Sequence, residues 1–214
     1  MEYTHRKWLW TQLAERTVEN LKKHGFDARF VETADEARDL ILELSGGYNS
    51  YGFAGSSTTR ALGLPETFNA RGATVFDHWA PDLPPGEDLK IRLEQGRCDC
   101  FFTSANAISA TGEIVNVDGV GNRTNAMTFG PKKVFVVAGM NKVAPDLDSA
   151  IRRVREVAGP MRARSLNMET PCAKTGLCND CNVPQRICRV TTILHRRPIL
   201  TDLTVVLINE TLGF

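Results

Sequence analysis

The chain has 214 residues, of which 42% are hydrophobic and 24% charged, and its mean hydropathy of −0.22 is typical of a globular protein with a sizeable core. Lys and Arg total 26 against 25 for Asp and Glu, which excludes the basic field that nucleic-acid binding needs. No apolar run approaches the roughly 18 residues of a membrane span, and the N-terminal residues lack the apolar stretch of a secretory signal, so we expect a cytoplasmic protein with no membrane span.

Helical and strand patterns alternate along the chain. Apolar residues at helical spacing end at Gly25, and the capping box of Thr33 and Glu36 opens a second helix that runs to about Leu44. Further helices are predicted over residues 86–95, 122–127 and 146–166. Strands are predicted over residues 26–32, 50–55, 73–79, 98–104, 109–119, 133–139, 191–196 and 203–210.

This order predicts an α/β layered fold with a mostly parallel sheet, a locally antiparallel part, and a C-terminal Cys-rich loop followed by a strand pair. We expect one domain over residues 1–214, with the Cys-rich segment 171–189 inside it. In such sheets ligands bind beyond the carboxyl ends of the strands, so the loops that follow strands are the ones to examine for chemistry.

The first such loop begins at Gly55, between a predicted strand and a short helix. Gly55 allows a sharp turn, and the hydroxyl and N–H groups of Ser56, Ser57 and Thr58 suit a carboxylate or phosphate. The spacing matches neither a Walker loop nor a dinucleotide fingerprint. The alternative is a plain helix N-cap rich in Ser and Thr.

A second loop follows the predicted strand that ends near residue 118. Arg123 has the geometry to clamp a carboxylate, and Asp118 is a candidate base or a partner that holds Arg123. The alternative is a glycine turn joined by an Asp–Arg pair. The candidate binding residues here are Asn116, Gly119, Gly121, Asn122 and Arg123.

His78 ends another strand and is a candidate for acid–base work, although an ordinary hydrogen-bonded histidine fits equally. Thr103, Ser104 and Asn106 follow a further strand end and are candidates to line the same crevice, or to satisfy loop backbone. The arginines of the helix over 146–166 are interpreted as its solvated face. They are Arg152, Arg153, Arg155, Arg162 and Arg164.

Four cysteines lie within 17 residues, at the spacing C-x5-C-x2-C-x6-C. They are Cys172, Cys178, Cys181 and Cys188. Four thiolates suit a tetrahedral zinc site, and they equally suit an iron–sulfur cluster. The third interpretation is four unliganded thiols, while the expected compartment disfavours disulfides.

Several longer runs resemble the lactate-utilisation (LUD) domain family, LutC/YkgG-like. They are FFTSANAISATGEIVNVDGVGNR, FGPKKVFVVAGMNK, TPCAKTGLCNDCNVPQRIC and VVLINETLGF, with DHW upstream. The resemblance covers nearly the whole chain. It implies a NagB/RpiA/CoA-transferase-like fold, in which the loops from Gly55 and from Gly119 would hold phosphate, carboxylate or CoA carbonyl groups.

The resemblance also implies a link to an iron–sulfur system that oxidises L-lactate to pyruvate with redox partner subunits. On that basis we expect the pocket to bind a small carboxylate or other anionic metabolite, such as a lactate-like 2-hydroxy acid. Arg123 would then neutralise the carboxylate, and His78 or Asp118 would accept the hydroxyl proton. Two alternatives stay open: a zinc-stabilised module that senses a metabolite, and an isomerase or CoA-transferase type of enzyme.

Overall fold

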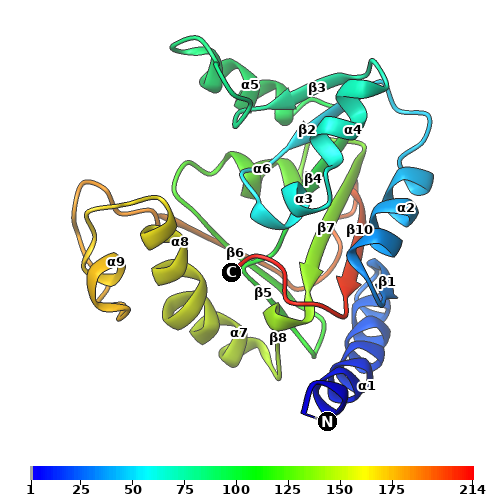
Figure 1. Ribbon diagram of the computed structural model, residues 1–214, viewed down its shortest axis with the longest axis vertical. Helices are drawn as coiled ribbons and strands as arrows, with labels where there is room; N and C mark the ends of the chain where they lie inside the picture. The colour runs from blue at the N-terminus through cyan, green and yellow to red at the C-terminus, as the bar shows by residue number, and fades with distance from the viewer. Residues whose placement is uncertain (1) are drawn as a thin grey trace.

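The computed structural model describes residues 2–214, and its main feature is a six-stranded sheet (Figure 1). Every neighbouring pair in this sheet is parallel, which confirms the predicted α/β class. In spatial order the strands are β1 (Asp27–Val31), β10 (Asp202–Ile208), β7 (Lys133–Gly139), β4 (Cys100–Thr103), β2 (Ser50–Phe53) and β3 (Thr74–Asp77).

Helices cover both faces of this sheet, so its central strands are almost entirely buried. Every residue of β7 is buried, as are six of the seven residues of β10. The covering helices are α1 (Glu2–Lys23), α2 (Ala34–Leu44), α3 (Ser57–Ala61), α4 (Leu64–Ala70), α5 (Glu87–Gln95) and α6 (Asn122–Thr128).

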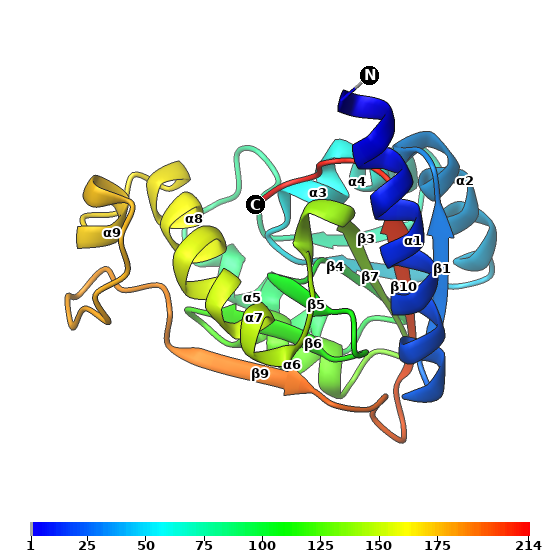
Figure 2. The ribbon, with the colours of Figure 1, turned by 90° about the horizontal axis from the view of Figure 1, so that it is seen from below.

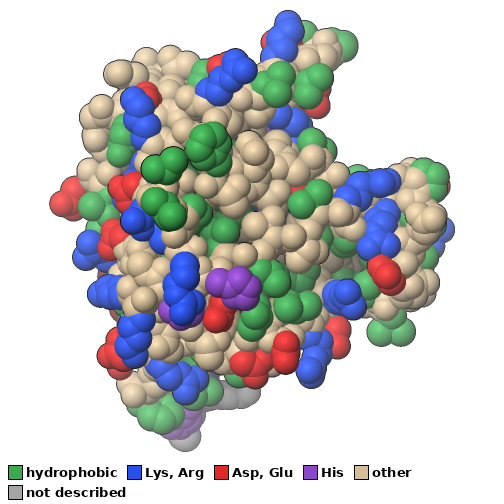
Figure 3. Space-filling model, turned by 180° about the vertical axis from the view of Figure 1, so that it is seen from behind, with side chains coloured by type: hydrophobic (Ala, Val, Ile, Leu, Met, Phe, Trp, Pro, Cys, Tyr) green, Lys and Arg blue, Asp and Glu red, His purple; other side chains and the backbone are tan. Residues whose placement is uncertain are grey.

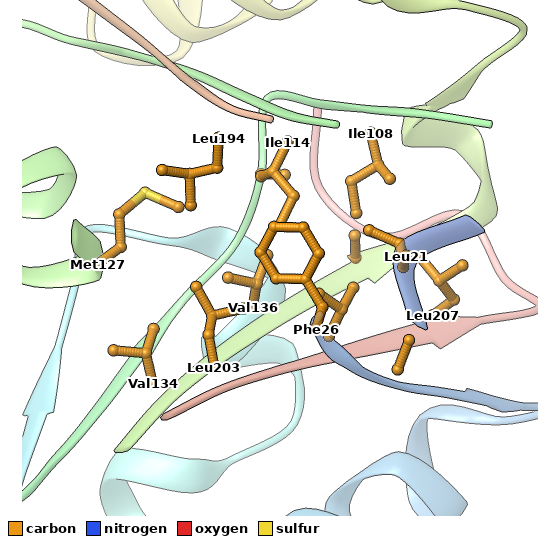
Figure 4. Packing of buried hydrophobic residues seen from close by; sticks show 14 of the residues in the cluster. Leu21, Phe26, Ile108, Ile114, Met127, Val134, Val136, Leu194, Leu203 and Leu207 are labelled. Atoms are coloured by element: carbon orange, nitrogen blue, oxygen red, sulfur yellow. The ribbon is translucent and has the colours of Figure 1, made fainter. Parts of the chain in front are cut away.

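The two faces have separate cores. On one face, Leu21 of α1 and Phe26 pack on Leu203 and Leu207 of β10, and Met127 of α6 joins the same cluster (Figure 4). On the other face, Ala37 and Ile41 of α2 pack near a group of stacked aromatic rings. These rings belong to Tyr51, Phe53, Phe68, Phe102 and Phe135.

Helix α2 begins at the predicted capping box, but Glu36 bonds to a different backbone N–H than a standard capping box uses. The Thr33 side chain accepts a hydrogen bond from the Glu36 N–H, as an N-cap does. Glu36 Oε2 in turn accepts from the N–H of Glu32, one residue before the N-cap. The capping box therefore closes on Glu32, the residue that follows the end of β1.

A smaller sheet lies beside the first, with strand order β8 (Val143–Ala144), β5 (Ala107–Ser109), β6 (Ile114–Asp118) and β9 (Val190–Leu194). Its β5–β6 and β6–β9 pairs are antiparallel, which supplies the expected antiparallel part. The two C-terminal strands both form, but β9 pairs with β6 while β10 joins the main sheet. Residues 195–201 connect the two strands.

The helix predicted over residues 146–166 forms as three consecutive segments. They are α7 (Leu147–Arg153), a π-helical stretch (Val154–Ala158) and α8 (Gly159–Ser165). Pro160 explains the interruption, because proline has no N–H for the preceding turn and its ring crowds the carbonyl four residues back. A short helix, α9 (Pro171–Thr175), follows and begins the Cys-rich segment.

Charged side chains of both signs are interspersed on the face opposite to that of Figure 1, and neither sign forms a continuous patch there among the described residues (Figure 3). This distribution agrees with the near balance of charge in the sequence. None of the helices within residues 2–214 has the length and apolar character that a membrane crossing requires.

Candidate anion-binding site

A cavity of about 400 Å³ opens beyond the carboxyl ends of the main sheet. Its walls come from segments that directly follow β2, β3, β4, β7 and β10, together with the end of β6 and the π-helical stretch and α8. Both ribbon views show the C-terminal tail leaving β10 and ending between α3 and α8 (Figures 1 and 2). The location is the one expected for a ligand site in a parallel sheet.

Most of the residues predicted for the site line this cavity. They are Gly55, Ser56, Ser57, Thr58, His78, Asp118, Gly119, Asn122 and Arg123, with Ser104 and Asn106 from the loop after β4. Asn116 and Gly121 are not among the lining residues. Asn116 is fully buried, and its Oδ1 accepts from the N–H of Asn106, so it supports the loop from behind.

Asp118 and Arg123 form a tight ion pair at the cavity wall. Arg123 Nε and Nη2 lie 2.9 and 2.8 Å from Asp118 Oδ1, and Asp118 Oδ2 accepts from the N–H of Thr124. Arg123 Nη2 also donates to Asn106 Oδ1 and to the carbonyl of Val117. Nη1 makes no hydrogen bond to residues 2–214, so this nitrogen of the guanidinium is left for a ligand.

The Gly55 loop combines capping and packing. Ser56 Oγ accepts from the Thr59 N–H and caps α3, which is the plain N-cap interpretation. A Cβ on Gly55 would lie 2.6 Å from the indole of Trp79, so the glycine makes room for that ring. Its backbone angle φ is not positive, and close approach explains the glycine better than a sharp turn.

The His78 ring is buried and held from one side. Gln95 Nε2 lies 2.8 Å from His78 Nδ1, and the amide nitrogen is a donor, so Nδ1 accepts and Nε2 carries the proton. Burial, and then the charge of Arg92, lowers the pKa of His78 to about 4. The neutral ring is therefore a donor at Nε2, while the prediction that His78 or Asp118 accepts a proton stays a prediction.

Lys142, which was not predicted as a site residue, also lines the cavity and follows β7 in a short 3-10 helix (Met140–Lys142). Its Nζ lies 2.9 Å from Thr58 Oγ1 and 2.9 Å from Ser104 Oγ, and the residue is only 4% exposed. Burial, followed by the charges of Arg153 and Arg123, lowers the pKa of Lys142 to about 7. The available signal was a lysine shortly after the end of a buried strand, at the carboxyl edge of the sheet.

Two of the helix arginines are not on a solvated face, which corrects that interpretation. Arg162 lines the cavity, and its guanidinium lies 4.5 Å from the centre of the Trp79 ring. Arg153 donates to the carbonyls of Asn106 and Asn141. The interruption before Pro160 changes the helical register, and periodicity alone therefore assigned Arg162 to the wrong side. Arg152, Arg155 and Arg164 are exposed, as expected.

The cavity is strongly cationic. Among the described residues, its lining side chains include Arg92, Arg123, Lys142 and Arg162 and one carboxylate, Asp118. Burial, and then the charge of Arg123, lowers the pKa of Arg162, and Arg123 also contributes to the lowered pKa of Lys142, so these charges are close enough to repel one another. Like charges that converge on one cavity are most readily balanced by a bound anion.

The four clustered cysteines are free thiols that share one neighbourhood. The pKa of Cys188 is raised by burial and then by the charges of Cys172, Cys178 and Cys181. Arg186 orders the loop by donating to the carbonyls of Cys181 and Cys188. The donor set fits a thiolate-binding metal in kind, but within residues 2–214 no three His, Cys, Asp or Glu side chains are arranged to hold one.

The Cys-rich segment borders the cavity. Ile187 and Cys188 are among its lining residues, and a Cβ on Gly159 of α8 would lie 3.7 Å from Cys188 Sγ. Cys178 instead lines a second hollow, beside Arg152 and Arg155. In both ribbon views α9 and the following segment project from the side of the molecule opposite α1 and α2 (Figures 1 and 2).

The chain is similar to a known protein family and to a solved structure. The family model described as LUD domain matches residues 14–208. A crystal structure of a DUF162 family protein from Deinococcus radiodurans is similar in fold, with a TM-score of 0.55, 15% sequence identity, and coverage of 93% of this chain and 98% of that chain. No curated protein matches.

Proposed function

Since the chain belongs to the LUD domain family and is thereby related to lactate utilisation, we propose that its cavity binds a small carboxylate of the lactate-like 2-hydroxy acid type. One observation carries this proposal: among the described residues, three arginines, one lysine and one carboxylate converge on a cavity of about 400 Å³. A cavity of that size suits a small metabolite.

Arg123 is the residue we assign to the carboxylate of the ligand. Its Nε and Nη2 are fixed by Asp118 and Asn106, so Nη1 is presented in a defined direction. A guanidinium held in this way loses little conformational freedom when an anion binds. The Nε2–H of His78 and the amide of Asn122 then supply donors for the remaining oxygens of the ligand.

The test is calorimetric titration with L-lactate. We expect Arg123→Ala to weaken lactate binding by at least about tenfold, because it removes a charge-assisted hydrogen bond of roughly 1.5–3 kcal/mol. Arg29→Ala is the control, since Arg29 lies on β1 and pairs with Asp27. Unchanged lactate affinity in a folded Arg123→Ala protein would exclude this loop as the site.

We also propose that the four clustered cysteines hold a metal centre, either an iron–sulfur cluster or zinc. If the centre is an iron–sulfur cluster, it serves a redox complex. The support is their shared neighbourhood around Cys188 and the position of Cys188 at the cavity wall. When bound, a cluster would supply one-electron transfer and zinc would supply structural support. The thiols would have to draw together around either metal.

Anaerobic purification with metal analysis and a visible spectrum tests this second proposal. We expect bound metal in the wild type and in Cys98→Ala, because Cys98 is buried in the main core away from the loop. Cys181→Ser should lose the metal. Colourless protein with one zinc would remove the electron-transfer role, and metal-free protein would remove the centre altogether.

A further inference from the structure

We propose that Lys142 condenses with the carbonyl carbon of a small 2-oxo acid in the cavity, so that its Nζ forms an imine with the ligand. The inference rests on the proposed function, because it uses the same carboxylate site to orient the acid. It narrows the ligand from any small carboxylate to one with a carbonyl group next to the carboxylate.

Lys142 is buried without a carboxylate partner among the described residues. Its side chain is 4% exposed, yet none of the described Asp or Glu residues lies within ion-pair distance of Nζ. Buried lysines are ordinarily paired with a carboxylate. A buried amine without a carboxylate, at the wall of a cavity, is the arrangement found for nucleophilic lysines.

The hydrogen bonds around Lys142 Nζ suit a neutral amine. Both neighbours of Nζ use their own hydroxyl hydrogens elsewhere: Thr58 Oγ1 donates to the carbonyl of Leu212, and Ser104 Oγ donates to that of Ala105. Each hydroxyl therefore accepts from Lys142. A neutral amine has two hydrogens, which these two oxygens satisfy, and one lone pair, which is left for an electrophile.

The surroundings of Lys142 also favour the neutral amine over the charged one. Burial, and then the charges of Arg153 and Arg123, disfavour a proton on Nζ, so the pKa of Lys142 falls to about 7. About half of the amine is then neutral at that pH. The ligand carboxylate, held by Arg123, would place the adjacent carbonyl carbon beside the lone pair.

Lys133 provides a matched contrast within the same strand. It is also buried, at 8% exposure, but its Nζ lies 2.9 Å from Asp202 Oδ2. It begins β7, at the opposite end of the strand from Lys142. The two buried lysines therefore differ in the one respect that decides whether the amine is available.

The reaction needs no further reactant. Nζ forms a bond to C2 of the acid, the carbonyl electron pair moves to oxygen, and the two amine hydrogens leave with that oxygen as water. The product is an imine, C=N, with no change in oxidation state. Borohydride then delivers hydride to the imine carbon and fixes the adduct as a secondary amine.

The experiment is to treat the whole protein with pyruvate and borohydride and to map the modified peptides by mass spectrometry. We expect the reduced pyruvyl adduct on Lys142 at a level at least about tenfold above Lys133 and the exposed lysines. The rate of labelling should rise as the pH is raised through about 7, because the amine loses its proton there. Label spread evenly over the lysines, or absent from Lys142, would overturn the inference.

Two variants and a second ligand separate the outcomes. Lys133→Met should label like the wild type, while Lys142→Arg should lose the label, because a guanidinium does not form the imine. L-lactate has a hydroxyl group at C2 in place of the ketone of pyruvate, so it should protect Lys142 without reacting. Lactate binding without any pyruvyl adduct overturns the imine alone, and failure of both acids to bind overturns the proposed function as well.

Discussion

The buried ring of His78 makes the stability of the protein depend on pH. The pKa lies near 4, against an ordinary value of 6.5, so the unfolded chain binds more protons than the folded chain between those two values. The free energy of unfolding therefore rises with pH across this window. Folded protein at neutral pH loses that contribution as the pH falls from about 6.5 through 4.

We expect His78→Asn to reduce this loss of stability in acid by about 2 kcal/mol. Asn Oδ1 can still accept from Gln95, but the side chain does not titrate. Urea unfolding at a series of pH values between 4 and 7 measures the effect as a change in slope, independent of any uniform destabilisation. His5→Asn is the control, because His5 is exposed; an unaltered slope in His78→Asn would show that the ring is not held neutral.

Sequence reasoning at the residue level succeeded where partners are close along the chain. Asp118 and Arg123 are five residues apart, and their pairing was one of the two expected outcomes. Lys142 was missed, because its partners Thr58 and Ser104 are 84 and 38 residues away. A charge appears solvated in a sequence until the packing that buries it is known.

Among the elements, the loops after β2 and β3 form one unit through Trp79. The indole packs against Gly55 and carries two guanidinium groups, Arg162 at 4.5 Å and Arg60 at 5.1 Å from the ring centre. Arg60 is held in turn by Asp77 at the end of β3. The ring thus sets the position of α8 relative to the main sheet.

Gly55→Ala is expected to displace this ring, because the added Cβ would meet the indole at 2.6 Å. We expect a destabilisation of about 1–3 kcal/mol, typical of overpacking, and weaker lactate binding as Arg162 shifts. Thermal unfolding and titration calorimetry measure the two effects. Gly46→Ala is the control, since its Cβ would meet the nearest atom at an ordinary 3.4 Å; equal behaviour of the two variants would contradict the assignment.

The order and type of most elements were predictable, because periodicity and caps are local signals. The same signals failed at Pro160, where a helix expected to be continuous acquires a π-helical stretch, and at β9, which pairs with β6 over more than seventy residues. A proline in a helical pattern does signal the interruption. Partner choice among strands depends on the packing of the whole chain, which no local pattern contains.

At the scale of the molecule, the C-terminal tail joins the end of β10 to the loops of β2 and β7. Asn141 holds the tail at two points: its Oδ1 accepts from the Leu212 N–H, and its Nδ2 donates to the carbonyl of Gly213. Thr58 Oγ1 donates to the carbonyl of Leu212. Gly213 and Phe214 line the cavity, and a Cβ on Gly213 would lie 3.2 Å from Lys142 Nζ, so the tail closes one side of the cavity beside this lysine.

Asn141→Ala tests whether the tail is a closing element of the site or a passive end. Loss of two hydrogen bonds should speed amide exchange at Leu212 by about thirtyfold, because each contributes roughly 1 kcal/mol to local stability. Global stability should change little, since the sheet strands are untouched. Asn69→Ala, on the exposed end of α4, is the control.

The same variant should also release bound lactate faster, because the tail no longer covers the ligand. Stopped-flow displacement measures this release rate, and hydrogen exchange followed by mass spectrometry measures the tail. Faster exchange with an unchanged release rate would show that the tail moves independently of the ligand. Since the tail and Lys142 share the hydroxyl of Thr58, coupled changes in both readouts are what the contacts require.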